Sequence, residues 1–256
     1  MSGRIPLIVA HRGASGEAPE NTLAAFRRAL EIGVDGVELD VHLTSDGEPV
    51  VIHDPMLDRT TDGLGLVRDQ TLAAVRRLDA GRWFGERFAG ERVPTLAEAL
   101  DLLRPVRVIV EVKNGPIYYP GIAARVAAEV RAAGHPSVTA SSFDHPVLVE
   151  LKAEATRLGT TLDTAVLYVG RPVNPVGLAR DAGADALHPH WAYLTPELVG
   201  AAHAAGLRVE TWTVDDPLYL AHVMGMAPDG VMSNHPGRLR EFLAAHGHPL
   251  PPAAAS

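Results

Sequence analysis

The stretch Val37-Glu38-Leu39-Asp40-Val41-His42-Leu43-Thr44-Ser45-Asp46-Gly47-Glu48-Pro49-Val50-Val51-Ile52-His53-Asp54 places two carboxylates inside an apolar run and then returns to a histidine. Side chains alternate between the two faces of a strand, so Glu38 and Asp40 point one way and their aliphatic neighbours the other way. Burying two carboxylates side by side is unfavourable, because each desolvated charge needs a counter-charge and like charges disfavour joint ionisation. A hard divalent cation would meet both needs.

A solvated strand face or a simple salt bridge is the alternative for any isolated Glu-x-Asp pair. The apolar residues around Glu38 and Asp40, and the His53-Asp54 pair that follows, favour the cation site over these alternatives.

Composition limits the classes of partner. The chain has 256 residues, 46% of them hydrophobic, and a formal net charge of -8. It contains no long basic run, which argues against nucleic acid as a partner, so local cations would have to meet an anionic substrate. The absence of cysteine excludes disulfides, thiolate metal sites and cysteine nucleophiles.

The first residues, Met1 to Pro6, are too few before the first apolar run to form a signal peptide. No apolar run approaches the ~18 residues of a membrane span. We therefore expect a soluble, cytoplasmic protein without stable membrane association. The sequence leaves the oligomeric state open.

Apolar runs and helical patterns alternate along the chain, which is typical of parallel strands joined by helices. Strands are predicted at 7–10, 36–41, 106–113, 138–142, 164–169, 186–189, 207–213 and 230–233. Helices are predicted at 21–30, 95–103, 119–133, 146–156, 176–182, 196–205, 217–224 and 238–245, the first with Asn21 as its N-cap.

Eight such units in one domain spanning residues 1–256 predict a closed (β/α)₈ TIM barrel, with an open doubly wound sheet as the alternative. Residues 55–92 form a small insertion after strand 2. Insertions after barrel strands lie on the catalytic face, so this one is predicted to be a lid or substrate wall that uses Trp83 and Phe84; a purely structural excursion is the alternative. The Pro- and Ala-rich tail, 246–256, is expected to be frayed.

Functional groups of a parallel barrel gather at the carboxyl ends of its strands. Polar residues stand at four of these ends. They are His11 and Arg12 after the first strand, Glu38 and Asp40 on the second with His53 beyond it, Glu111 and Lys113 on the third, and Trp212 on the seventh.

The three carboxylates Glu38, Asp40 and Glu111 would form an oxygen site suited to Mg²⁺ or Ca²⁺. Arg12 and Lys113 beside it would favour a phosphate. Taken singly, each residue has a structural explanation, because Glu111 and Lys113 could be an ion pair and His11 a hydrogen-bonded histidine. Their expected coincidence on one face favours the functional interpretation.

The sequence resembles the glycerophosphodiester phosphodiesterases, which are TIM barrels of the phospholipase-C-like type. The resemblance covers nearly the whole chain. Its matching pieces, in order, are Ala10-His11-Arg12-Gly13, Pro19-Glu20-Asn21-Thr22, Glu38-Leu39-Asp40-Val41, Thr44-Ser45-Asp46-Gly47, His53-Asp54, Arg59-Thr60-Thr61 with Gly63, Val93-Pro94-Thr95-Leu96-Ala97-Glu98, Glu111-Val112-Lys113, Ser141-Ser142-Phe143 and Trp212-Thr213-Val214.

The resemblance implies a phosphoric diester hydrolase that cleaves glycerophosphodiesters to sn-glycerol 3-phosphate and an alcohol such as choline or ethanolamine. It implies roles for eight residues. Glu38, Asp40 and Glu111 would bind the metal, Arg12, Lys113 and Trp212 the substrate, and His11 and His53 would act as base and acid respectively.

Two positions depart from the family pattern. Asp215 stands where the family often has Asn, and Asn234 stands where it often has Asp. Neither is expected to contact the reacting groups. Among the remaining histidines, His42 is expected at the mouth of the barrel. His145, His188 and His190 are expected to line the rim or to be structural.

Two other functions fit the same fold. A phospholipase acting on intact lipids would need an apolar docking rim, and the sequence contains no basic amphipathic helix to supply one. A non-catalytic phosphodiester-binding barrel would be expected to lose His11 or His53, and both are present.

Overall fold

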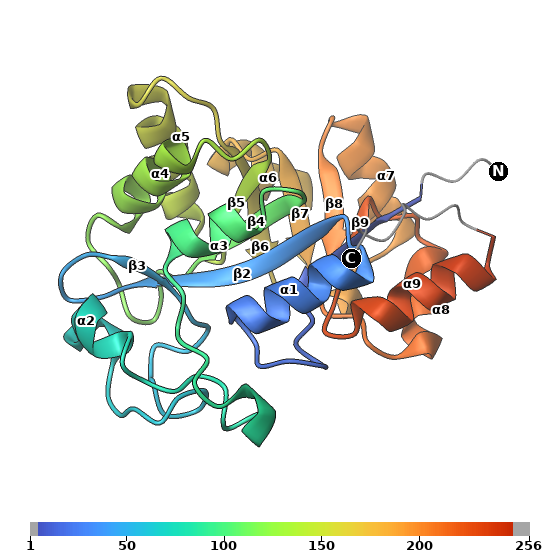
Figure 1. The fold of residues 1–256 in the computed structure, drawn as a ribbon. Helices are drawn as coiled ribbons and strands as arrows, with labels where there is room; N and C mark the ends of the chain where they lie inside the picture. Colours follow the sequence, from blue (N-terminus) through green and yellow to red (C-terminus); the bar gives the residue numbers. More distant parts are fainter. Residues whose placement is uncertain (1–4, 248–256) are drawn as a thin grey trace.

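The computed structural model describes residues 5–247 and shows parallel strands closed into a barrel with helices around it (Figure 1). The strand order is β1-β9-β8-β7-β6-β5-β4-β2-β3, and an additional pairing of β1 with β2 closes the ring. The predicted (β/α)₈ barrel is confirmed, and the open doubly wound alternative is wrong. The strands are β1 (Leu7–His11), β2 (Gly36–Leu43), β3 (Pro49–Val51), β4 (Arg107–Val112), β5 (Val138–Ser142), β6 (Asp163–Tyr168), β7 (Ala186–Pro189), β8 (Arg208–Thr211) and β9 (Gly230–Ser233).

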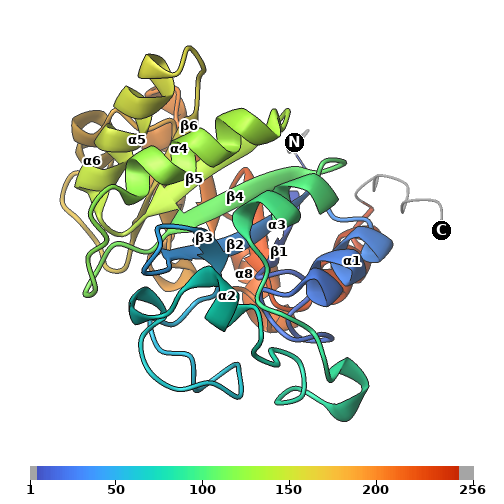
Figure 2. The ribbon, with the colours of Figure 1, turned by 60° about the vertical axis from the view of Figure 1, so that its left-hand side comes forward.

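The helices pack around the strands, as Figures 1 and 2 show from two directions. They are α1 (Leu23–Ile32), α2 (Leu72–Val75), α3 (Leu96–Leu102), α4 (Ile122–Ala133), α5 (His145–Arg157), α6 (Pro175–Ala182), α7 (Pro196–Ala204), α8 (Pro217–Met224) and α9 (Pro236–Ala245). Of the tail expected to be frayed, residues 248–256 lie outside the described part of the chain.

The N-cap of α1 is Thr22, whose side chain accepts the Ala25 N–H, so the prediction of Asn21 as the cap is wrong by one residue. Asn21 has a left-handed backbone, with φ of 57°. That conformation is uncommon outside glycine but is tolerated by asparagine. It turns the Asn21 side chain into the barrel instead of along the helix.

The short strand β3 was not predicted. It pairs antiparallel with the end of β2, Val41 opposite Val51, after a tight turn that contains Gly47 at φ 79°. Glycine adopts that angle without steric cost. Beyond β3 the Ile52 N–H donates to the Asp40 carbonyl oxygen at 3.0 Å. The hairpin therefore brings the chain back to β2 just before His53.

Residues on the two faces of β2 have different surroundings. Val37, Leu39 and Val41 belong to the large apolar core between the strands and the helices. Inside the barrel a smaller apolar cluster contains Val9, Ile109 and Met232, and it belongs to the other side of the strands. The pleat places Glu38 and Asp40 on this inner side.

The insertion forms a small satellite structure at the end of β2 (Figure 2), with 3₁₀ turns at Val67–Asp69 and Glu86–Phe88. It has an apolar cluster of its own, which includes Leu57, Val67 and Val75. The guanidinium of Arg76 donates to both carboxylate oxygens of Glu98 on α3, each at 2.7 Å, and this ties the insertion to the barrel.

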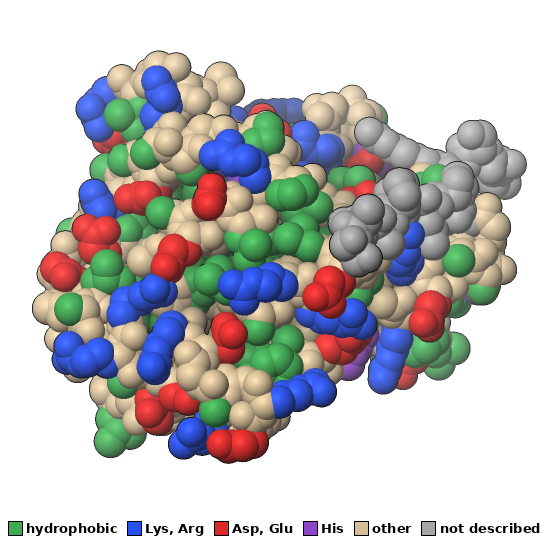
Figure 3. All heavy atoms as spheres, viewed as in Figure 1, with side chains coloured by type: hydrophobic (Ala, Val, Ile, Leu, Met, Phe, Trp, Pro, Cys, Tyr) green, Lys and Arg blue, Asp and Glu red, His purple; other side chains and the backbone are tan. Residues whose placement is uncertain are grey.

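The outer surface is mixed in charge. On the face that Figure 3 shows, cationic and anionic side chains alternate with apolar ones. Among the described residues, none of the helices is long and apolar enough to cross a membrane.

Candidate active site

A small cavity of about 60 Å³ lies inside the barrel at the carboxyl ends of its strands. It is lined by His11, Arg12, Glu38, His53, Glu111, Lys113 and Trp212, that is, by every predicted site residue except Asp40. A larger hollow, of about 650 Å³, lies beside Phe84 and contains none of these residues. Size therefore does not identify the site here, and the chemistry of the lining does.

The register of the strands explains why the site residues meet. His11 on β1 pairs with Glu38 on β2, and Asp40 on β2 pairs with Glu111 on β4. Neighbouring residues on parallel strands share a face, so four functional side chains come together on three adjacent strands.

Glu38, Asp40 and Glu111 each offer a carboxylate oxygen, and these oxygens lie within 4.8 Å of one another. All three residues are buried, and Glu38 Oε1 has no hydrogen-bond partner among the described residues. A buried carboxylate oxygen without a partner is costly. An oxygen-only donor set with an unsatisfied buried oxygen fits a hard cation such as Mg²⁺ or Ca²⁺.

Two cationic side chains adjoin the carboxylates. Lys113 Nζ lies 2.9 Å from Asp40 Oδ1 and also contacts Glu111, and Arg12 Nε lies 3.3 Å from Asp40 Oδ2. Three carboxylates and two cations leave one net negative charge when all are ionised. A divalent cation together with a singly charged phosphodiester would bring the site to neutrality.

The pKa values of the three carboxyl groups diverge. Burial, with Asp40 and Glu111 as neighbours, raises the pKa of Glu38 well above its ordinary value. Burial also raises the pKa of Glu111 to about 7, although Lys113 opposes the rise. At Asp40 burial acts in the same direction, but Lys113 and Arg12 outweigh it and hold the pKa far below its usual range. A bound cation would replace protons held by Glu38 and Glu111.

Asn21 was predicted to cap a helix, but it hydrogen-bonds to the site residue Asp40. Its Nδ2 donates to Asp40 Oδ2 at 2.7 Å, and its Oδ1 accepts the Asp40 N–H at 3.3 Å. These two bonds fix Asp40 against β2. The position of Asn21 next to Glu20, in the loop that joins β1 to α1, was the feature of the sequence that could have indicated this role.

Arg12 has a left-handed backbone with φ of 58°, a strained conformation that is found at functional sites. The turn directs the Arg12 N–H to Glu38 Oε2 at 3.0 Å. Gly13 follows at φ 80°, and a Cβ there would lie 2.8 Å from Ala25. The sharp turn after β1 thus requires glycine at position 13 and supplies a backbone donor to the carboxylate cluster.

His11 contacts two residues that are far apart in the sequence. Its Nδ1 lies 2.7 Å from Asn234 Oδ1, and its Nε2 lies 3.9 Å from Glu38 Oε2. Burial and the nearby Arg12 lower the pKa of His11 to about 4, so the ring is neutral at pH 7. Asn234 touches this predicted catalytic residue from behind, and it is not among the residues that line the cavity.

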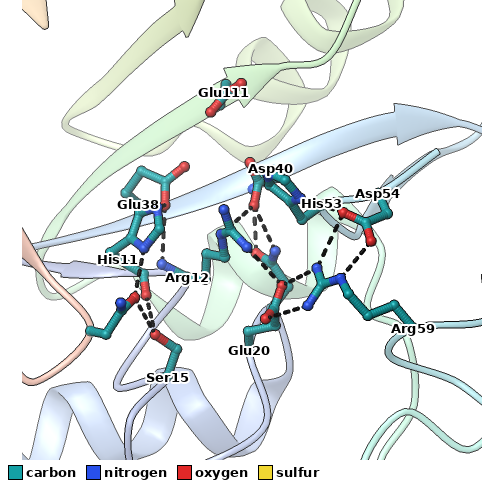
Figure 4. A network of polar contacts seen from close by, with 12 residues as sticks. His11, Arg12, Ser15, Glu20, Glu38, Asp40, His53, Asp54, Arg59 and Glu111 are labelled. Carbon is teal, nitrogen blue, oxygen red and sulfur yellow. Dashed lines mark hydrogen bonds and ion pairs between the residues drawn. The ribbon is translucent and has the colours of Figure 1, made fainter. Parts of the chain in front are cut away.

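His53 is held by a network that Figure 4 shows. Its Nδ1 lies 2.6 Å from Asp54 Oδ1, and Arg59 of the insertion contacts Asp54. Arg59 Nη2 also donates to Glu20 Oε1 at 2.7 Å, and Arg12 Nη1 donates to the same oxygen at 2.9 Å. Glu20 therefore joins the Asp54 side of the network to Arg12. Burial lowers the pKa of His53, and the Asp54 hydrogen bond opposes that change.

Trp83 and Phe84 do not line the catalytic cavity. Their rings contact each other, and Phe84 also contacts Phe88 and lines the separate hollow beside α1. The insertion reaches the site through Arg59 instead, so the choice of these two aromatic residues as a substrate wall is not supported.

Two other aromatic rings line the cavity. Phe143 and Trp212 form an edge-to-face pair with ring centroids 5.6 Å apart and planes 84° apart. Trp212 Nε1 donates to the His188 carbonyl oxygen at 2.8 Å, which fixes the indole. The predicted substrate residue Trp212 is thus one wall of an aromatic corner beside the charged groups.

His42 shares the inner face of β2 but is buried and does not lie at the mouth. Its Nε2 lies 2.9 Å from the His53 carbonyl oxygen, which can only accept, so Nε2 carries the proton. Its Nδ1 then accepts from Tyr119 Oη at 2.7 Å. His42 supports the backbone at His53.

His145 donates through Nε2 to the Leu167 carbonyl oxygen and is structural. His190 stacks on Trp191 at the rim. His188, in contrast, lines the cavity with both ring nitrogens buried and without a hydrogen bond among the described residues, although its Nε2 lies 3.7 Å from Glu210 Oε2.

The buried His188 predicts an acid-sensitive stability. Burial lowers its pKa from 6.5 to about 4, so between these values the unfolded chain binds a proton that the folded chain does not. The contribution of the neutral His188 to the free energy of unfolding is complete above pH 6.5 and is lost as the pH falls towards 4. That contribution reaches roughly 3 kcal/mol.

Urea unfolding at several pH values tests this. Relative to wild type, His188→Gln should show a shallower fall in unfolding free energy from pH 6.5 to 4. His222→Gln, at an exposed helical position, should keep the wild-type slope. A wild-type slope in His188→Gln would contradict the assignment.

Arg12→Lys should lower kcat/KM by ~10-fold to ~100-fold although it keeps the charge. Lysine cannot reproduce a planar contact with a phosphate and the bond to Glu20 at once, and hydrogen bonds to charged groups contribute about 1.5–3 kcal/mol. Steady-state kinetics should show the loss, with Arg28→Lys, an exposed pair with Glu17, as the control. Unchanged kcat/KM would make Arg12 a structural residue.

Comparison with known proteins agrees with this geometry. The profile of the glycerophosphoryl diester phosphodiesterase family matches residues 11–238, which is most of the chain. The chain belongs to this family. It is therefore placed among the phosphoric diester hydrolases.

The following three relatives match this family member over almost their whole length. The glycerophosphodiester phosphodiesterase of Caldanaerobacter subterraneus subsp. tengcongensis is 41% identical over 244 residues, covering 94% of this chain and 99% of the relative. A solved phosphodiesterase of Oleispira antarctica, in complex with the product sn-glycerol-3-phosphate, is 31% identical with a TM-score of 0.84 and covers 94% and 97%. The glycerophosphodiester phosphodiesterase of Agrobacterium tumefaciens is 31% identical with a TM-score of 0.80 and covers 93% and 100%.

Proposed function

We propose that the chain is a metal-dependent glycerophosphodiester phosphodiesterase, hydrolysing glycerophosphodiesters to sn-glycerol 3-phosphate and an alcohol. One observation carries the proposal: a single cavity is lined by two of the three clustered carboxylates, two cationic side chains and the two proposed catalytic histidines, and the third carboxylate, Asp40, lies directly beside Lys113. A phosphodiester needs each of these, namely charge neutralisation, positioning and proton transfer at two oxygens.

Glu38, Asp40 and Glu111 hold the cation, which supplies positive charge to the phosphoryl oxygens when bound. Arg12 and Lys113 bind the remaining phosphate charge. The Phe143–Trp212 corner receives an apolar or cationic part of the substrate.

The two histidines have different partners, and this supports different roles. His11 faces the neutral amide of Asn234, which leaves it uncharged and able to take a proton from the attacking oxygen. His53 faces the carboxylate of Asp54, which stabilises the imidazolium and so opposes the lowering of the His53 pKa by burial. In that charged form His53 would give a proton to the departing alkoxide. We assign His11 as the base and His53 as the acid.

The proposal is tested with a panel of substrates. Purified protein is incubated with glycerophosphocholine, glycerophosphoethanolamine, glycerophosphoglycerol and an intact phospholipid, with Mg²⁺, with Ca²⁺ and with chelator. Glycerol 3-phosphate should form from the deacylated diesters only when cation is present. Release of a head group from the intact lipid, with no product from the deacylated diesters, would favour the phospholipase. No product from any substrate would favour a binding protein. A cytoplasmic location stays a prediction.

A further inference from the structure

Asn234 lies directly after β9 and joins His11 to Asp215. Its Oδ1 lies 2.7 Å from His11 Nδ1, and its Nδ2 donates to Asp215 Oδ2 at 2.7 Å. Asp215 Oδ1 also accepts the Asn234 N–H at 2.8 Å and the Ser233 hydroxyl at 2.9 Å. Both carboxylate oxygens of Asp215 thus accept hydrogen bonds, and the three donors belong to the adjacent residues Ser233 and Asn234.

These contacts fix the orientation of the Asn234 amide. A carboxylate only accepts hydrogen bonds, so the NH₂ group of Asn234 must face Asp215 and its oxygen must face His11. An amide oxygen also only accepts. His11 Nδ1 must therefore carry the proton, and in the neutral ring Nε2 has the free lone pair.

The free nitrogen lies on the side of the site where a base is needed. His11 Nε2 is the ring atom that lies 3.9 Å from Glu38 Oε2, within the cavity that collects the charged groups. Asp215 does not touch His11 and acts on it through Asn234. If the amide turned over, its NH₂ group would face Nδ1, the proton would move to Nε2, and the base would lose its lone pair.

The backbone around the pair is held in place. The Val214 N–H donates to the Met232 carbonyl oxygen at 2.9 Å, and the Gly16 N–H donates to the Asn234 carbonyl oxygen at 2.8 Å. Ser15 Oγ lies 2.9 Å from Asn234 Oδ1 and 2.8 Å from the His11 carbonyl oxygen. Three loops therefore meet around one amide group.

We infer that Asp215 and Asn234 form a coupled pair of positioning residues that fixes the tautomer and the ring orientation of His11. These are the two positions that depart from the family pattern: the family often has an amide at 215 and an acid at 234, and this chain has the reverse. A reversed pair can make equivalent bonds, since a new amide at 215 can donate to a new carboxylate at 234, which still accepts from His11 Nδ1. The inference that this matters for turnover rests on the proposed role of His11 as base.

The test uses Asp215→Asn, Asn234→Asp and the double variant, assayed with glycerophosphocholine at saturating Mg²⁺. Asp215→Asn frees the amide to turn over, and Asn234→Asp places two carboxylates at hydrogen-bonding distance. Each should lower kcat by ~10-fold to ~100-fold with KM within ~3-fold, and the double variant should recover to within ~5-fold of wild type. Asp216→Asn is the control, because Asp216 caps α8 through the Leu218 N–H and should leave kcat unchanged.

A second readout does not depend on activity. Nitrogen-15 NMR of the histidine rings, with His11 assigned by its loss in His11→Gln, should show the Nδ1–H form in wild type and in the double variant. Asp215→Asn should show a larger share of the Nε2–H form. An unchanged tautomer in Asp215→Asn, or a double variant no more active than Asp215→Asn, would overturn the pair. Wild-type protein that hydrolyses no diester would refute the proposed function, while the NMR comparison would still decide the pair.

Discussion

Glu38→Gln should lower kcat/KM for a glycerophosphodiester by at least about 1000-fold, and exhaustive chelation of wild type should do the same. A bound cation contributes several kcal/mol to charge stabilisation during displacement at phosphorus, and each 1.36 kcal/mol is tenfold in rate. Glu38 has a buried oxygen, Oε1, to which no described residue hydrogen-bonds, so its replacement removes a ligand and leaves the aromatic walls and the histidines in place.

Calorimetric titration and thermal unfolding separate binding from turnover. Mg²⁺ or Ca²⁺ should raise the melting temperature of wild type, because the cation binds only the folded site and relieves repulsion among its carboxylates. The rise should shrink in Glu38→Gln and persist in Glu48→Gln, whose carboxylate pairs with Arg125 outside the cavity. Full turnover after chelation, together with a fully active Glu38→Gln, would show that the three carboxylates do not hold an essential metal.

The alternation of the sequence was sufficient to place the carboxylate cluster. Glu38 and Asp40 share a face because a strand has a period of two, and Glu111 joins them because adjacent barrel strands end at the same face. Neither step needs side-chain detail. The prediction of Asn21 as a helix cap failed because Asn and Thr both cap helices well, and only the left-handed backbone of Asn21 separates the two.

The hydrogen-bond partners of the histidines could be predicted only in part. Asp54 is adjacent to His53 in sequence and could be read as its partner. Asn234 is 223 residues from His11, and only closure of the barrel between β1 and β9 brings them together. The face of His42 was predicted correctly, but not its burial, because the covering ring of Tyr119 comes from the loop before α4.

The proposed division of labour between the histidines predicts different sensitivity to the leaving group. A general acid matters in proportion to how poor the leaving group is, and it contributes typically ~100-fold to ~10,000-fold. Choline and ethanolamine alkoxides leave poorly, whereas nitrophenolate leaves without protonation. His53→Ala should therefore lose ~100-fold or more on glycerophosphocholine and far less on bis(p-nitrophenyl) phosphate, because the imidazolium of His53, stabilised by Asp54, is the proposed proton donor.

His11→Ala should lose activity on both substrates, since an attacking oxygen must be activated whatever group departs. His222→Ala, at an exposed position on α8, is the control and should match wild type on both. A reversed pattern would exchange the roles of the two histidines. Equal losses in both variants on both substrates would mean that neither acts as a dedicated acid, and the different partners of the two rings, a carboxylate for His53 and an amide for His11, would then serve only to hold them in place.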